Sequence, residues 1–231
     1  MIKVKAMKSA EEGRGSGVNA KRSIKPEHFR MALEGGSIGR DNPRALVTSA
    51  YIAFTLGMGC RAVSEVHMVR NKDLQYGPTG KHGVPQWIEL GERVTKTRKG
   101  RPNDTRILEA KVFPDHDNPK TCYVRTLLCY NDRRTEAQRH PDAPFFINCK
   151  QSAVNNPEEE QFWYIGKGVG DSGIMGKHTL GSLLCDALTA VGVDCTIEKY
   201  SKISPARRCR LRGPRYPSFK ASGTQICCFE G

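Results

Sequence analysis

The chain has 231 residues, of which 38% are hydrophobic, and it carries 37 Lys and Arg against 24 Asp and Glu, a formal net charge of +13. This length suits one domain of moderate size. No apolar run approaches the ~18 residues that a membrane-spanning helix needs, so we expect no membrane partner. A balance this basic favours a polyanionic partner, nucleic acid first, although a merely basic surface gives the same charge.

The two ends of the chain differ in composition from its middle. Residues 1–25 are rich in Lys, Arg, Gly and Ser and poor in apolar groups, which predicts a disordered basic arm. Residues 209–231 are basic, contain Pro and Gly and lack apolar periodicity, which predicts an irregular basic tail. We therefore expect one folded domain over residues 26–208.

The first part of this domain predicts helices. Lys25–Leu33 has the pattern of a short helix. Asp41-Asn42-Pro43 is a helix-start signal, with Pro43 near the first turn. The strongly apolar segment that follows predicts a buried helix to Met58, and helical character returns over Arg61–Val69.

Extended segments are expected next, and helices after them. Gln86–Leu90 and Arg93–Arg98 predict two strands around a turn, and Arg106–Phe113 predicts a further extended stretch. Cys122–Ala137 then predicts a helix and Pro144–Ile147 a short extended segment.

The last predicted elements are apolar. Phe162-Trp163-Tyr164 is an aromatic cluster that we expect in the core, and Met175–Val191 has the leucine spacing of an amphipathic helix. The order of helices, small antiparallel sheet and helices predicts an α+β fold that is mainly helical.

No cofactor or metal site is predicted. The nine cysteines have irregular spacing without a Cys-x-x-Cys pair, which favours free thiols. Two glycine-rich segments imitate nucleotide-binding motifs and fail at a required position: Asp171 replaces a glycine in both, and His178 replaces the hydroxyl residue of a P-loop.

Four short motifs follow one another in an order that is informative. They are Gly59-Cys60-Arg61 with Glu65 four residues on, Thr95-Lys96-Thr97-Arg98-Lys99-Gly100, Pro141-Asp142-Ala143-Pro144-Phe145-Phe146, and Ser204-Pro205-Ala206-Arg207-Arg208. In these motifs the chain resembles the catalytic domain of tyrosine recombinases, the phage integrase-like fold. The resemblance is closest to the Crypton-derived domain at the C-termini of the zinc finger MYM-type and glutamine-rich families, and it runs from about Arg44 to Arg208.

The resemblance implies a vestigial catalytic site. Tyrosine recombinases clamp a DNA phosphate with two arginines and protonate the leaving oxygen with a lysine. These roles fall on Arg61, Arg207 and Lys96, with Glu65 supporting the first arginine and Lys99 as a substitute for the lysine. Arg98, Lys99 and Arg208 join the same three residues as expected DNA contacts.

Two departures from the family pattern argue against DNA cleavage. Ser204 stands where the family has the histidine that assists proton transfer. The only tyrosine after Arg207 is Tyr216, which precedes a proline and is a poor candidate for the nucleophile. We expect a C-terminally truncated recombinase core without the final helices.

The function expected from this resemblance is a nuclear DNA-binding domain of DNA integration and recombination ancestry that binds duplex backbone and no longer cuts it. Two other functions stay open: a nuclear protein–protein interaction domain, and an active recombinase truncated by a gene-model error. The residues also have simpler explanations. Arg61 would pair with Glu65 at i, i+4, Lys96, Arg98 and Lys99 would form a charged strand edge, and Arg207 would be one charge of a basic tail.

Overall fold

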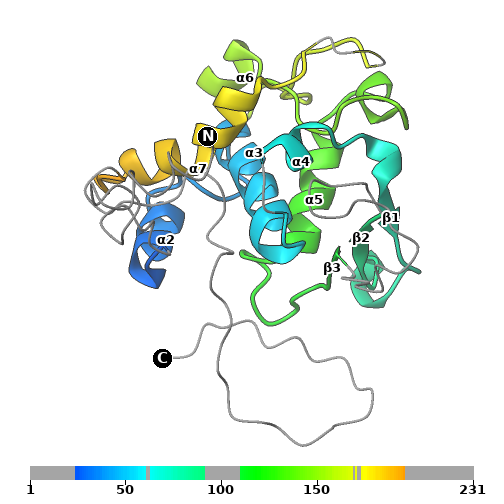
Figure 1. Cartoon of the computed structure of the whole chain (residues 1–231), viewed down its shortest axis with the longest axis horizontal. Helices are drawn as coiled ribbons and strands as arrows, with labels where there is room; N and C mark the ends of the chain where they lie inside the picture. Colours follow the sequence, from blue (N-terminus) through cyan, green and yellow to red (C-terminus); the bar gives the residue numbers. More distant parts are fainter. Residues whose placement is uncertain (1–23, 61–62, 92–109, 169, 171–172, 196–231) are drawn as a thin grey trace, which may run out of the picture.

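The computed structural model describes residues 24–60, 63–91, 110–168, 170 and 173–195 (Figure 1). This part of the chain contains six α-helices and one three-stranded sheet, so the predicted mixed α+β class is confirmed. The helices are α2 (Pro26–Glu34), α3 (Pro43–Ile52), α4 (Val63–His67), α5 (Tyr123–Asp132), α6 (Gln151–Asn155) and α7 (Lys177–Thr189). The predicted tail and nearly all of the predicted arm lie outside the described residues.

Helix α3 is the centre of the fold, with α5 and α7 on either side of it (Figure 1). It begins as the sequence predicts: the side-chain oxygen of Asn42 accepts a hydrogen bond from the Ala45 N–H at 2.8 Å, and Pro43 occupies the first turn. The helix continues into a short π-helix over Ala53–Gly57, where Phe54 is fully buried. The apolar run to Met58 is therefore buried, as predicted.

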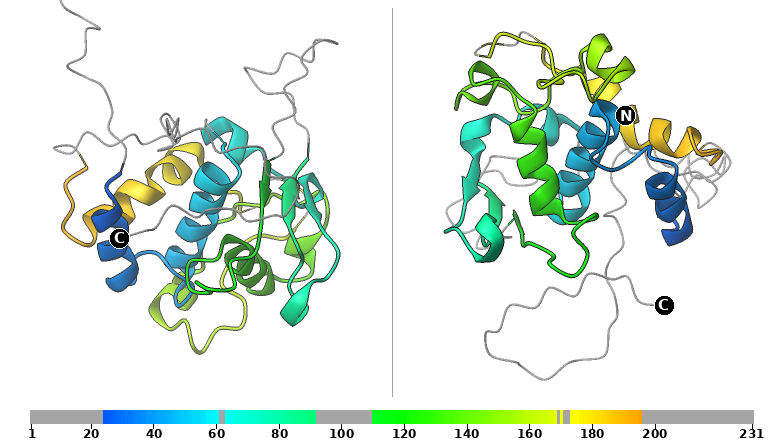
Figure 2. Two further views of the ribbon diagram at one scale, coloured as in Figure 1. Left: turned by 90° about the horizontal axis from the view of Figure 1, so that it is seen from below. Right: turned by 180° about the vertical axis from the view of Figure 1, so that it is seen from behind.

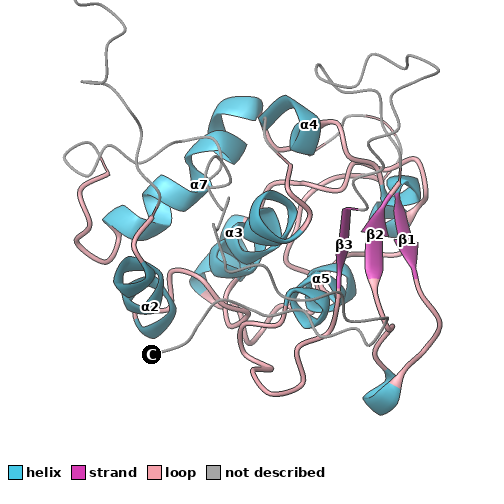
Figure 3. Ribbon diagram, turned by 60° about the horizontal axis from the view of Figure 1, so that its bottom comes forward, coloured by secondary structure: helices cyan, strands magenta, loops and turns pink. Residues whose placement is uncertain are grey.

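The sheet lies at one end of the molecule, beside α5 (Figure 3). Its strands β1 (Leu74–Tyr76), β2 (Ile88–Leu90) and β3 (Ala110–Val112) are antiparallel in the order β1-β2-β3. Strand β1 was not predicted, because a three-residue segment shows no alternation until a partner pairs with it.

The predicted pairing of Gln86–Leu90 with Arg93–Arg98 is a point of correction. Both edges of β2 are occupied, since Leu90 faces Leu74 on one side and Ala110 on the other. Arg93–Arg98, which lies outside the described residues, is thus not the partner of Ile88–Leu90. A central strand has only two edges, and two segments more distant in sequence take them.

The core is aromatic and draws on four separate segments. Phe54 from the π-helix lies 5.1 Å from Phe145 between ring centroids, and Tyr130 of α5 lies 4.7 Å from Tyr164. Trp163 and Tyr164 are buried, as predicted. The two phenylalanines of the Pro-Asp-x-Pro-Phe-Phe motif are core residues, which is why that motif ends in an aromatic pair.

A second, smaller core joins α2 to α7. Ala32 and Leu188 are fully buried there, and a Cβ on Gly35 would lie 2.6 Å from Cγ1 of Val191. Helix α7 matches the predicted Met175–Val191 segment within two residues at each end, whereas α5 ends at Asp132, before the predicted Ala137. Just past the end of α5, the side chain of Arg134 turns into the core.

Candidate nucleic-acid interface

The residues predicted to form the vestigial catalytic site fall almost entirely in segments that the structure does not describe. Arg61, Lys96, Arg98, Lys99, Arg207 and Arg208 lie outside the described residues. Glu65 is described and half-buried in α4. The described elements that precede and follow these segments in the sequence are the π-helix, α4, β2, β3 and α7. Their contacts show which of these elements pack together.

The chain that leads to Arg61 packs directly on the sheet. A Cβ on Gly57, at the end of the π-helix, would lie 2.6 Å from Cγ1 of Val112 in β3. Only a residue without a side chain allows this approach. Cys60, the neighbour of Arg61, is 7% exposed, and its N–H donates to the Phe54 carbonyl at 3.0 Å. The position before Arg61 is therefore anchored in the core.

Lys96 belongs to the segment that connects β2 to β3. Leu90 and Ala110 pair with each other, so the described strand ends before and after this segment lie side by side. Helix α4 lies on the same side of the molecule as these strand ends (Figures 2 and 3). The π-helix that precedes Arg61 in the sequence thus packs on β3, the strand that follows the segment of Lys96.

Helix α7 approaches α4 from the other side. A Cβ on Gly181 would lie 3.2 Å from Cγ2 of Val63, the first residue of α4. After α7 the chain turns back, and the Cys195 thiol donates to the Cys185 carbonyl at 3.6 Å. The segment that includes Arg207 follows Cys195 and lies outside the described residues.

A cluster of basic side chains that sequence reasoning missed surrounds the start of the Pro-Asp-x-Pro-Phe-Phe motif. Lys72 bonds to Asp142 at 2.7 Å, and Arg70 donates to the Asp142 backbone carbonyl at 3.2 Å. The hydrogen bond raises the pKa of Lys72 and lowers that of Asp142. Both side chains are more than half exposed, so solvent screens the pair and its contribution to stability is small.

Arg134 lies beneath this cluster and is fully buried. Its guanidinium donates to the side-chain oxygen of Asn71 at 2.7 Å, to the Pro144 carbonyl at 2.9 Å and to the Gln138 carbonyl. All three acceptors are neutral, and burial lowers the pKa of the guanidinium. The sequence offered no signal for this role, because Arg133-Arg134 after a helix has the pattern of an ordinary exposed pair.

The described residues bear on two other classes of site. No helix among them is long and apolar enough to cross a membrane. No group of three or more His, Cys, Asp or Glu side chains in this part of the chain is placed to hold a metal ion. The six cysteines at described positions are free thiols, as the irregular spacing predicted.

Comparison with known proteins returned no relative: the chain matches no family model, no curated protein and no solved structure.

Proposed function

We propose that the chain is a nuclear DNA-binding domain derived from a Crypton-type tyrosine recombinase, and that it binds the backbone of duplex DNA without cutting it. The sequence supports this with the ordered motifs around Arg61, Lys96 and Arg207 and with a net charge of +13. The proposal requires the tyrosine recombinase core. The α+β architecture of the described residues is compatible with that core but is a more general description.

One structural observation supports the proposal more than any other. The π-helix that precedes Arg61 packs on β3, and the segment that contains Lys96 joins β2 to β3. These positions are 35 residues apart in the sequence, so no local propensity brings their surroundings together. The proposal requires that Arg61 and Lys96, which lie outside the described residues, share one face, where an arginine and a lysine would bind a phosphate group.

Binding without cleavage follows from the chemistry of the residues present. Paired N–H donors of arginine and a lysine ammonium neutralise backbone phosphates and release counterions, which gives affinity for any sequence. Ser204 replaces the histidine of the family pattern, and a serine hydroxyl does not take up and return a proton near neutral pH as imidazole does. We infer that the interaction with DNA ends at binding.

Titration of a short duplex DNA with the full chain tests the proposal. We expect a Kd of about 10⁻⁴–10⁻⁶ M at physiological salt that weakens steeply as salt rises. Arg61→Ala and Lys96→Ala should weaken binding several-fold, and each should reduce the salt slope by about one. The matched control is Arg30→Ala, which removes an exposed arginine of α2. Absence of binding at low salt would refute the proposal and favour a nuclear protein partner.

A nicked suicide DNA substrate, which traps a covalent protein–DNA adduct, tests the second part of the proposal, that the chain does not cut DNA. We expect the DNA to stay free of covalently bound protein, because Tyr216, the one tyrosine after Arg207 in the sequence, precedes a proline and is a poor candidate for the nucleophile. A trapped adduct that disappears in Tyr216→Phe would show instead that the chain retains a working nucleophile.

A further inference from the structure

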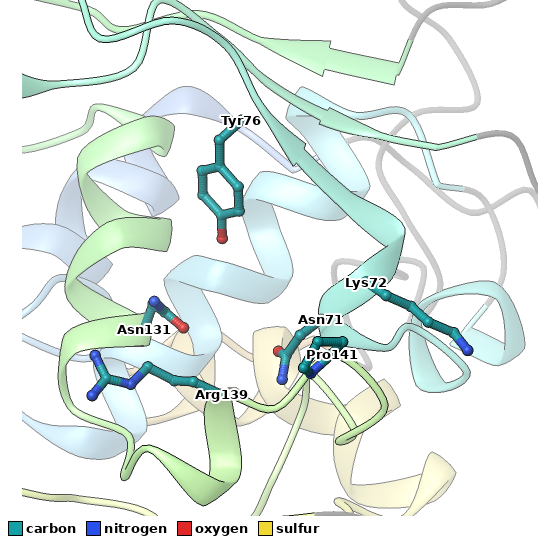
Figure 4. Close-up of a pocket in the computed structure, with 6 residues that line it drawn as sticks. All are labelled: Asn71, Lys72, Tyr76, Asn131, Arg139 and Pro141. Carbon is teal, nitrogen blue, oxygen red and sulfur yellow. The ribbon is translucent and has the colours of Figure 1, made fainter.

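A shallow pocket of about 180 Å³ lies beside the basic cluster, and the proposed DNA contact does not include it. It is formed where the turn before β1, the last residue of β1, the end of α5 and the loop after α5 meet, and it is lined by Asn71, Lys72, Tyr76, Asn131, Arg139 and Pro141 (Figure 4). In Figure 4 the Tyr76 hydroxyl points into the pocket, while Lys72 points away from it toward the solvent. Lys72 is engaged by Asp142, so it is not the group that defines the pocket.

Three lining side chains have hydrogen-bonding groups that the described residues do not use. Arg139 is exposed, and its guanidinium makes no hydrogen bond or ion pair with any described residue. The Tyr76 hydroxyl and the Asn131 amide likewise have no hydrogen-bond partner in the described part of the chain. A guanidinium, a phenol and an amide together offer a set of donors around a small volume.

The wall behind these donors is positively charged. Arg134 is fully buried, its three hydrogen bonds go to neutral oxygens, and its Nε has no partner among the described residues. Tyr76 lies close enough to this guanidinium for the two groups to affect each other's pKa. A buried charge that no carboxylate compensates projects its field into the nearest opening.

The opposing charges near the pocket are few. Burial raises the pKa of the Tyr76 hydroxyl, Arg134 opposes this, and Asp132, which is exposed to solvent, adds a smaller rise. Asp142 is neutralised by Lys72, with Arg70 and His140 also close to it. Asp73 is a further acid beside Lys72, and its carboxylate accepts a hydrogen bond from the Arg70 backbone N–H at 2.7 Å. Around the pocket the cations Arg70, Lys72, Arg134 and Arg139 thus stand against Asp73, Asp132 and Asp142, which leaves a small excess of positive charge.

We propose that this pocket binds a phosphate group, which Arg139 holds with paired N–H donors and to which Tyr76 and Asn131 donate hydrogen bonds. Arginine matches the geometry of a phosphate better than any other side chain, and Tyr and Asn are common partners of phosphate oxygens. The pocket is smaller than the roughly 300–1,000 Å³ of sites for larger organic ligands, which favours a small oxyanion. The source is either a nucleic-acid backbone or a free phosphate, and the site does not depend on Arg61 or Lys96.

The first test measures the thermal stability of the full chain in inorganic phosphate against chloride of equal ionic strength. A Kd near 1 mM would raise the Tm by about 3–6 °C at a tenfold excess of phosphate. We expect Arg139→Ala to lose most of this shift and Tyr76→Phe to lose part of it. Arg30→Ala should keep the full shift, which also separates binding from the general stabilising effect of phosphate.

The second test distinguishes the two sources by titrating the same variants with a short duplex DNA. If the phosphate belongs to DNA, Arg139→Ala weakens binding more than Arg30→Ala and lowers the salt slope by about one. If it is a free phosphate, the two variants bind duplex equally while the Tm shift of Arg139→Ala is still lost. An Arg139→Ala protein that is folded by circular dichroism and keeps the wild-type phosphate shift overturns the inference, whatever Lys96→Ala does to DNA binding.

Discussion

At the scale of single residues, the buried Arg134 has the largest structural role of any described charge. It joins the turn at Asn71, 63 residues away in the sequence, to the nearby loop at Gln138 and the motif residue Pro144. Its guanidinium also lies 5.6 Å from the ring centroid of Tyr130 and 5.4 Å from that of Phe145. Arginine fits this position because it offers five donors in a plane and stacks on aromatic rings.

Arg134→Ala should lower the free energy of unfolding by about 3 kcal/mol or more, because it leaves buried oxygens unpaired and opens a cavity. Urea unfolding followed by circular dichroism measures this. Arg134→Lys should restore little, since one ammonium does not span the three acceptors.

Arg133→Ala is the matched control for that prediction. Arg133 is half-buried and lies 4.1 Å from the Trp163 ring centroid, a contact worth about 1 kcal/mol. An equal decrease in the free energy of unfolding of Arg133→Ala and Arg134→Ala would contradict the larger structural role assigned to Arg134.

At the scale of elements, the packing of the π-helix on the sheet decides how the two halves of the domain meet. Gly57 sits where a Cβ would lie 2.6 Å from Val112 and 2.9 Å from Cδ2 of Tyr123. Its approach brings α3 and its continuation close to both β3 and α5. A larger residue here would separate the segment before Arg61 from the strands next to Lys96.

Gly57→Ala should destabilise the protein by about 1–3 kcal/mol, although alanine is otherwise the better helix former, because the added methyl overpacks a filled contact. The same substitution in a Val112→Ala background should cost less, since the closest atom has been removed. Urea unfolding of the two single variants and the double variant gives the interaction free energy between Gly57 and Val112.

Gly181→Ala is the control within another helix. Its Cβ would meet Val63 at 3.2 Å, a milder contact, so the loss should be smaller. If Gly57→Ala were neutral or stabilising, the close approach of the π-helix to β3 would be wrong.

At the scale of the whole molecule, the core contains many groups that lose a proton only at alkaline pH. Burial raises the pKa of Tyr51 to about 12 and that of the Cys149 thiol to about 11, and it raises the pKa of Tyr130 and Tyr164 strongly. In the unfolded chain these groups ionise near 10.0 for tyrosine and 9.0 for cysteine. The folded state therefore holds protons that the unfolded state has lost.

This difference predicts a loss of stability in alkali. The stabilising contribution is complete below about pH 9 and falls as the pH rises toward about 12, because the unfolded state binds fewer protons over that range. The urea midpoint, measured from neutral pH to about pH 11, should decline. Tyr51→Phe should show a shallower decline. An unchanged midpoint up to about pH 11, or a decline that Tyr51→Phe leaves as steep as in the wild type, would contradict this.

The sequence by itself determined the elements whose signals are local. Asn42 and Pro43 mark the start of α3, apolar spacing marks α7, and hydrophobic runs mark the buried centre, because caps and periodicity act within one or two turns of chain. It also supplied the ordered motifs and the basic charge from which DNA binding is proposed. Arg61, Lys96, Arg207 and their neighbours stay predictions, since they lie outside the described residues.

Only the tertiary structure decided which distant segments meet. Strand β1 exists because Leu74–Tyr76 pairs with β2, and Arg134, just past α5, finds an acceptor in Asn71, 63 residues away in the sequence. The pocket of Tyr76, Asn131 and Arg139 joins a strand, a helix end and a loop in the same way. Such contacts depend on the packing of the whole core, and no pattern within a single segment encodes them.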